Sequence, residues 1–179
     1  MHQNEEKNSG VRKRITDPMF TLLEQKSFSE ITVTEIVQKA GVARVSYYRY
    51  FDSKESVIQQ YIADLRVETQ KRMPPSDGWI HREDIIPRCE VALIAILKNR
   101  RQILGLYRNG FGTLLLESFN LYAEMVAGDM PYRSIDRYKL YFLTGALFNM
   151  VIRWLESGAS ESPLEMAHTF ANYMSGGCL

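Results

Sequence analysis

The residues best suited to contact another molecule gather in one short stretch, "RVSYYRYF" at residues 44–51. Eight positions hold three tyrosines, two arginines and a phenylalanine, a few residues after Gly41. Guanidinium groups donate paired hydrogen bonds to anions and to base edges, and phenolic hydroxyls can bond phosphate oxygens. A helix with rings and guanidinium groups around its whole circumference cannot bury all of them in its own core. Part of this stretch should therefore contact another molecule.

A helical wheel divides the stretch into an inner and an outer set. Val42, Tyr47 and Phe51 fall on the side that packs against neighbouring helices. The outer set can reach DNA, since Arg bonds guanine, Val touches a thymine methyl group and hydroxyls bond phosphates. A partner protein is the alternative, because Tyr and Arg also dominate protein interfaces. The outward or flanking residues are Arg44, Val45, Ser46, Tyr48, Arg49 and Tyr50.

The elements around this stretch predict a helix-turn-helix. "TVTEIVQKA" at 32–40 opens with a capping box, Thr32 with Glu35, and Gly41 ends that helix. A short helix over about 43–51 follows, and "DSKE" at 52–55 begins a longer one. Two short helices joined by a tight turn can place the second in the major groove of DNA.

An apolar stripe predicts a first helix over 11–26, which contains Pro18. An interior proline removes one backbone hydrogen bond and clashes with the carbonyl four residues earlier. We therefore expect that this helix either kinks at Pro18 or packs as a helix only from about Asp17 onward. Neither alternative removes the helix-turn-helix.

The charge of the chain is unevenly distributed. Residues 11–54 hold eight Lys and Arg against five Asp and Glu, whereas residues 55–179 hold thirteen against fourteen. The basic excess thus lies in the N-terminal quarter, which favours an anionic partner for that region.

The rest of the chain is also helical by its periodicity, so the predicted fold class is all-α with about nine helices. Breaks are predicted at 73–79, where two prolines and a glycine occur, and at 128–131. "SPLE" at 162–165 is a capping box with proline at the first helical position. The expected C-terminal helices are 83–99, 101–108, 111–127, 132–156 and 163–174.

Several classes of protein are excluded by what the sequence does not contain. No apolar run is long enough to span a membrane, and the first ten residues are too polar for a signal peptide. Cys89 and Cys178 form no CxxC pair, which predicts reduced thiols and a cytoplasmic location. We find no phosphate loop, metal-ligand spacing or catalytic constellation, so we expect no enzyme, no metal and no cofactor.

The segment 27–62 carries a recognisable set of residues: Phe28, Ile31, Thr32, Val33, Ile36, Ala40, Gly41, Val42, Tyr48, Phe51, Lys54, Val57 and Ile58. With these residues the segment resembles the N-terminal signature of the TetR family of transcriptional regulators. The resemblance implies a DNA-binding domain at 1–52, a dimerisation and effector domain at 53–179, and double-stranded operator DNA as partner. The DNA-contacting positions of the family correspond here to Thr32, Thr34, Arg44, Val45, Ser46, Tyr48, Arg49, Tyr50 and Lys54.

Residues 141–167 are similar to the C-terminal region of a subgroup like the dihydroxyacetone-kinase operon regulator. This similarity implies that the last two helices pair with their twofold mates in a homodimer. Gly145 beside Ala146 would allow two backbones to approach closely. The expected interface residues recur at helical spacing: Tyr138, Phe142, Gly145, Phe148, Asn149 and Ile152.

An effector pocket is the usual switch in this family, and aromatic residues between 100 and 155 are its candidates here. Ordinary core packing explains the same residues, and a protein effector is an alternative to a small molecule. A palindromic operator and repression are the outcomes that the family favours. The alternatives are activation, or an interaction module that has lost operator binding. The pocket candidates are Tyr107, Arg108, Phe111, Phe119, Tyr122, Tyr141 and Trp154, with Arg108 as an anchor for an anion.

Overall fold

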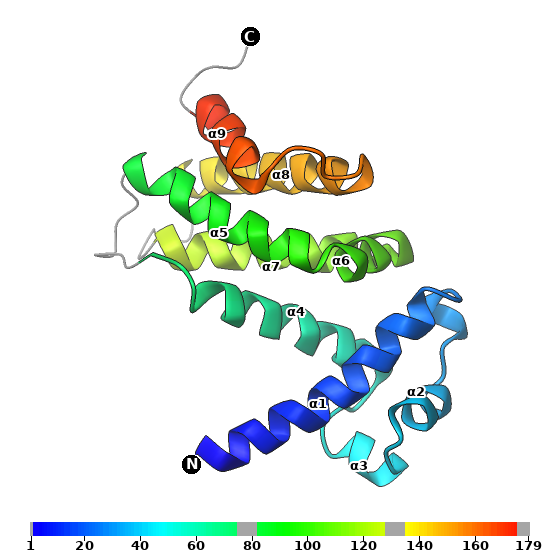
Figure 1. Ribbon diagram of the computed structural model, residues 1–179. Helices are drawn as coiled ribbons and strands as arrows, with labels where there is room; N and C mark the ends of the chain where they lie inside the picture. Colours follow the sequence, from blue (N-terminus) through cyan, green and yellow to red (C-terminus); the bar gives the residue numbers. More distant parts are fainter. Residues whose placement is uncertain (1, 75–81, 128–134, 175–179) are drawn as a thin grey trace.

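The computed structural model describes residues 2–74, 82–127 and 135–174, and within these ranges it confirms the all-α fold (Figure 1). Nine α-helices, two 3-10 turns and one π-type turn make up the described secondary structure. The predicted breaks at 73–79 and 128–131 fall mostly outside these residues, as does Cys178. The elements are α1 (His2–Leu23), η1 (Phe28–Glu30), α2 (Val33–Ala40), α3 (Arg44–Tyr48), α4 (Lys54–Gln70), η2 (Arg82–Asp84), α5 (Ile85–Lys98), α6 (Arg100–Leu106), η3 (Tyr107–Phe111), α7 (Gly112–Ala127), α8 (Ile135–Glu156) and α9 (Pro163–Met174).

Helices α1, α2 and α3 form one end of the molecule, with α1 packed against α2, α4 and α6 (Figure 1). Helix α3 has five residues, too few to be stable on its own, so its position depends on packing. Tyr47 and Phe51 supply that packing, because both are buried as the helical wheel predicts. Their neighbours in the N-terminal core include Ile15, Met19, Ile36 and Val57.

Polar contacts fix both ends of α2. The predicted capping box is present, since Thr32 Oγ1 accepts from the Glu35 amide at 3.3 Å and Glu35 Oε2 accepts from the Thr32 amide at 2.9 Å. Gly41 ends the helix with φ 62°, the left-handed conformation that glycine adopts without strain. Lys26, which follows α1, also pairs with Glu35 at 2.5 Å. The Lys26 ammonium and the cap together lower the pKa of Glu35 to about 2.

The C-terminal helices form a layered bundle that α4 joins to the N-terminal end. Helix α5 packs on α9, and α7 packs on α8. Figure 1 shows α8 and α9 at the opposite end of the molecule from α3. Helix α9 begins at Pro163 as predicted, after a capping box in which the Ser162 amide donates to Glu165 Oε2 at 2.7 Å. Across the described ranges, no helix combines the length and apolar character that crossing a bilayer requires.

Helix α1 passes through Pro18 without a break and extends from His2 to Leu23. The expectation that the packed helix starts near Asp17 is therefore wrong. Ile15 and Met19, on either side of Pro18, are both completely buried in the core. This packing holds the helix together across the one backbone hydrogen bond that a proline cannot make.

We predict that Pro18→Ala stabilises the protein. Alanine restores the missing amide and favours the helical conformation, which should add up to about 3 kcal/mol to the free energy of unfolding. Urea denaturation followed by circular dichroism measures the change. A Pro18→Ala protein with a lower midpoint would show that the helix is adapted to the proline ring.

Candidate nucleic-acid interface

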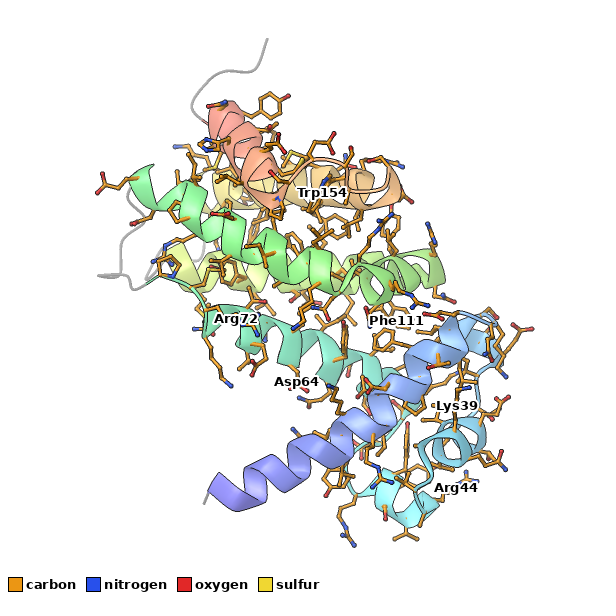
Figure 2. The ribbon with its side chains drawn as sticks, in the orientation of Figure 1. Lys39, Arg44, Asp64, Arg72, Phe111 and Trp154 are labelled. Carbon is orange, nitrogen blue, oxygen red and sulfur yellow. The ribbon has the colours of Figure 1, made fainter. Side chains whose placement is uncertain are left out.

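The outer face of α3 projects into solvent at the end of the molecule remote from α8 and α9. Val45 has 76% of its surface exposed, which is unusual for an apolar side chain, and Arg44, Tyr48 and Arg49 are exposed beside it. In Figure 2 the labelled Arg44 lies at the outer edge of the molecule, at the opposite end from Trp154. Side chains that suit a major groove are therefore accessible together.

Tyr47 anchors α3 from behind. Its hydroxyl donates a 2.9 Å hydrogen bond to the Ser53 carbonyl, in the turn before α4. Its ring meets the Tyr48 ring edge-on, with centroids 5.3 Å apart, and lies 5.7 Å from the Phe51 ring. Burial raises the pKa of the Tyr47 phenol to about 12, so it remains a neutral donor at physiological pH. The outer face is thus presented by a fixed inner face.

Arg44 and Tyr48 interact on the exposed surface. Arg44 Nη2 donates to the Tyr48 hydroxyl at 3.2 Å, and the guanidinium carbon lies 5.6 Å from the centre of the Tyr48 ring. These contacts restrict the long Arg44 side chain, which is nevertheless exposed. An arginine held in this way can form a paired hydrogen bond with a base edge at lower entropic cost.

The other predicted DNA-contacting residues surround α3 or begin α2. Thr32 and Thr34 are exposed in the first turn of α2, although the Thr32 hydroxyl already serves the capping box. Ser46 and Tyr50 are half-buried at the flanks of α3. The structure therefore brings these residues into one region, with Arg44, Val45, Tyr48 and Arg49 the most accessible.

Lys54 has a different role from the predicted phosphate contact. Its Nζ donates to the carbonyls of Phe28, Ser29 and Ile31 at 2.7, 3.2 and 2.9 Å, and lies 4.5 Å from the centre of the Phe28 ring. An ammonium group has three protons, so three carbonyl acceptors use all of its donors. Lys54 therefore ties the η1 turn to the start of α4, and its contact with DNA phosphate stays a prediction.

The structure contains an apolar cavity whose walls differ largely from the predicted effector pocket, which stays a prediction. This cavity of about 230 Å³ lies among helices α4 to α9. Of the seven predicted residues, only Phe119 and Tyr122 line it. Arg88, 92% buried, is one of the few polar groups in the wall, and its Nη2 donates to the Pro74 carbonyl at 3.0 Å. Burial raises the pKa of the Tyr122 phenol and of the Cys89 thiol, the latter to about 11.

The other five pocket candidates are used elsewhere in the fold. Trp154 is buried and donates through Nε1 to the Glu161 carbonyl at 3.1 Å. The Tyr141 hydroxyl donates to Glu124, and Arg108 is exposed, so it cannot anchor an anion in this cavity. Tyr107 and Phe111 belong to η3 and pack outside the cavity wall.

The predicted interface residues of α8 divide into two groups. Phe142 and Tyr138 have 75% and 67% of their surfaces exposed, Asn149 is exposed and Gly145 is half-buried. Ile152 is instead 2% exposed, because it faces the interior of the helical bundle, where it lines the cavity. Phe148 is half-buried with its ring 5.5 Å from that of Phe119, and both Phe148 and Ile152 line the cavity. These two residues therefore belong to the chain's own core.

Sequence reasoning did not identify Asn109 as a contact between the two parts of the chain. Asn109 Oδ1 accepts a 2.9 Å hydrogen bond from the Phe28 amide, and its Nδ2 donates to the Gly105 carbonyl at 2.9 Å. The Asn109-Gly110 dipeptide is a strong turn signal that marks this position in the sequence. Its partner is 81 residues away, and no local pattern could have identified it.

Comparisons with known proteins agree with this geometry. The family model described as "Bacterial regulatory proteins, tetR family" matches residues 16–61. The HTH-type transcriptional regulator YdgC of Bacillus subtilis (strain 168) is 28% identical over 109 residues, covering 59% of this chain and 56% of that protein. The chain spans about half the length of the curated relatives it matches.

Two solved structures share the fold over nearly the whole chain. A TetR transcriptional regulator from Streptococcus agalactiae 2603V has a TM-score of 0.65 and 16% identity, covering 96% of this chain and 97% of its own. The dihydroxyacetone kinase operon activator DhaS has a TM-score of 0.64 and 14% identity, covering 93% and 95%. Residues 16–61 thus match the TetR family of bacterial regulatory proteins, and the whole chain shares its fold with these two solved structures.

Proposed function

We propose that this protein is a transcriptional regulator that binds double-stranded DNA through the outer face of α3. The exposure of Val45 between Arg44 and Tyr48 carries the proposal. An isolated apolar side chain costs little in solvent, but on a helix-turn-helix it is placed to contact a thymine methyl group. The basic excess of residues 11–54 adds attraction to phosphates.

A homodimer places two copies of α3 on one DNA molecule. Phe142 and Tyr138 lie one helical turn apart on α8, and Leu164 and Tyr173 of α9 are also exposed. A twofold axis at this end of the molecule sets the same patch against itself and leaves both α3 helices free. Two identical reading helices related by a twofold axis require a palindromic operator.

Repression is the simplest consequence of such binding, because a dimer bound to promoter DNA excludes RNA polymerase. The cavity of about 230 Å³ supports regulation by a small apolar ligand. An engineered apolar cavity of only about 150 Å³ already binds benzene, so this cavity is large enough for a ligand of that size. The Arg88 and Tyr122 side chains would add polar selectivity at the wall. Domain roles follow: residues 1–52 bind DNA, and residues 53–179 dimerise and respond to the ligand.

Two substitutions distinguish a side chain that contacts DNA from one that stabilises the fold: Arg44→Ala for the first and Lys54→Met for the second. We expect Arg44→Ala to weaken binding to the preferred duplex by about 1–3 kcal/mol and to relax the preference at one base in each half-site. Its melting temperature should stay unchanged, because the side chain is exposed. Duplexes selected from a random pool, with affinities from electrophoretic shifts, provide the measurement.

Lys54→Met should behave in the opposite way. The loss of three hydrogen bonds to carbonyls should lower the free energy of unfolding by about 1–3 kcal/mol. In the folded protein, the slope of log affinity against log salt concentration should match that of the unsubstituted chain. A slope that is shallower by about 0.9 would instead identify Lys54 as a phosphate contact.

Gly145→Leu tests the dimer. A Cβ at Gly145 meets no atom of its own chain within 4 Å, so the folded monomer should tolerate leucine. Against a second copy, overpacking should cost about 1–3 kcal/mol in each subunit and shift sedimentation toward the monomer. Gly10→Leu, on α1 with the same open surroundings, is the matched control and should stay dimeric. An unaltered Gly145→Leu dimer would place the interface elsewhere.

A further inference from the structure

The η3 turn is a local departure from helix between two regular helices. Gly110 has φ 87° and ψ 7°, and Asn109 has φ −94° and ψ 16°, so neither continues the helix. Positive φ favours glycine, and the Asn109 side chain supports the turn by donating to the Gly105 carbonyl at 2.9 Å. Gly112 has its own packing reason, since a Cβ there would lie 3.3 Å from the Tyr107 ring. Such turns inside helices are frequent at functional sites.

One side of η3 contacts the DNA-binding end at Phe28. Asn109 Oδ1 accepts from the Phe28 amide at 2.9 Å, and the Phe111 ring meets the Phe28 ring edge-on with centroids 4.8 Å apart. Figure 2 shows Phe111 close to the C-terminal end of α1. Phe28 is also where Lys54 bonds, so a displacement of this residue moves the turn that leads into α2.

The other side of η3 contacts the cavity wall. The Tyr107 ring lies 6.3 Å from that of Phe148, which in turn packs on Phe119. Phe148 and Phe119 line the cavity, as do Ile103 in the helix before η3 and Leu115 in the helix after it. A molecule that fills the cavity therefore contacts Ile103 in the helix before η3 and Leu115 in the helix after it. It also contacts Phe148, whose ring packs on Tyr107 of η3 itself.

We propose that Asn109 is the positioning residue that links occupancy of the cavity to the position of the η1 turn and α2. The link depends on the proposed regulatory function, which it deepens. Displacement of Phe148 or Ile103 tilts η3, and the Asn109–Phe28 hydrogen bond carries that tilt to the η1 turn. The neighbouring ion pair between Arg101 and Glu24 is exposed and adds little to such a coupling.

Asn99 provides a matched comparison on the same segment. Its Nδ2 donates to the Ala95 carbonyl at 2.8 Å, and its Oδ1 accepts from the Tyr61 hydroxyl at 3.0 Å. Asn99 and Asn109 thus share one pattern: Nδ2 donates to the carbonyl four residues back, and Oδ1 accepts from a donor distant in the sequence. Only Asn109 reaches the η1 turn, so substitutions at the two residues separate coupling from general stability.

The test is amide hydrogen exchange on the full chain, without DNA. The cavity is filled by Ala92→Phe in its wall or, in the unsubstituted chain, by pressurised xenon, which enters apolar cavities. We expect either filling to change exchange of the Phe28 amide and of residues 27–36 by at least about fivefold, the lower end of typical allosteric couplings. No DNA is needed, so this result is independent of whether the protein binds DNA.

Three substitutions then locate the link. Asn109→Ser can still bond the Gly105 carbonyl but cannot reach Phe28, so the response to filling should be lost. Asn109→Asp keeps the acceptor for Phe28 and should retain the response, as should Asn99→Ser. An Asn109→Ser protein that responds like the unsubstituted chain, an Asn99→Ser protein that does not respond, or exchange unchanged by both fillings would overturn the proposal.

Discussion

The three hydrogen bonds from Lys54 to the carbonyls of Phe28, Ser29 and Ile31 are the contact on which the DNA-binding end depends. Within the turn the Phe28 carbonyl accepts from the Ile31 amide at 3.2 Å, and the Lys54 ammonium bonds this carbonyl together with those of Ser29 and Ile31. Helix α2 begins two residues after Ile31, so the direction of α2 is set by this turn. The same turn receives Asn109 and Phe111 from the C-terminal bundle. One residue, Phe28, therefore joins the two parts of the chain.

The short helix α3 can expose its outer face because the side chains of its inner face are buried in the core and hold the helix in place. Tyr47 is buried on three sides by its hydroxyl bond to Ser53 and its ring contacts with Tyr48 and Phe51. A five-residue helix has little stability of its own, so this packing supplies nearly all of it. Arg44, Val45 and Arg49 remain exposed on the outer face, where DNA could reach them.

Local patterns in the sequence predicted the parts of the fold that local interactions determine. The caps at Thr32 and Ser162 satisfy nearby amides, and α2 and α9 begin where those signals lie. The roles of Lys54 and Asn109 could not be predicted, because their partners are 23–26 and 81 residues away. Ile152 was assigned to the dimer surface because periodicity alone does not show which stripe of α8 faces the chain's own core. The walls of the cavity could not be predicted for a similar reason, since they depend on how six helices pack.

A titration of the isotope-labelled protein with its selected duplex, followed by backbone amide NMR, tests most directly whether α3 reads DNA. The account predicts the largest shifts at Thr32–Thr34 and Ala43–Arg49, with small shifts along α8 from Tyr138 to Arg153. It also predicts that the Lys54 ammonium keeps its carbonyl partners in the complex. Shifts concentrated on α8, with the amides of α3 unmoved at saturation, would contradict it.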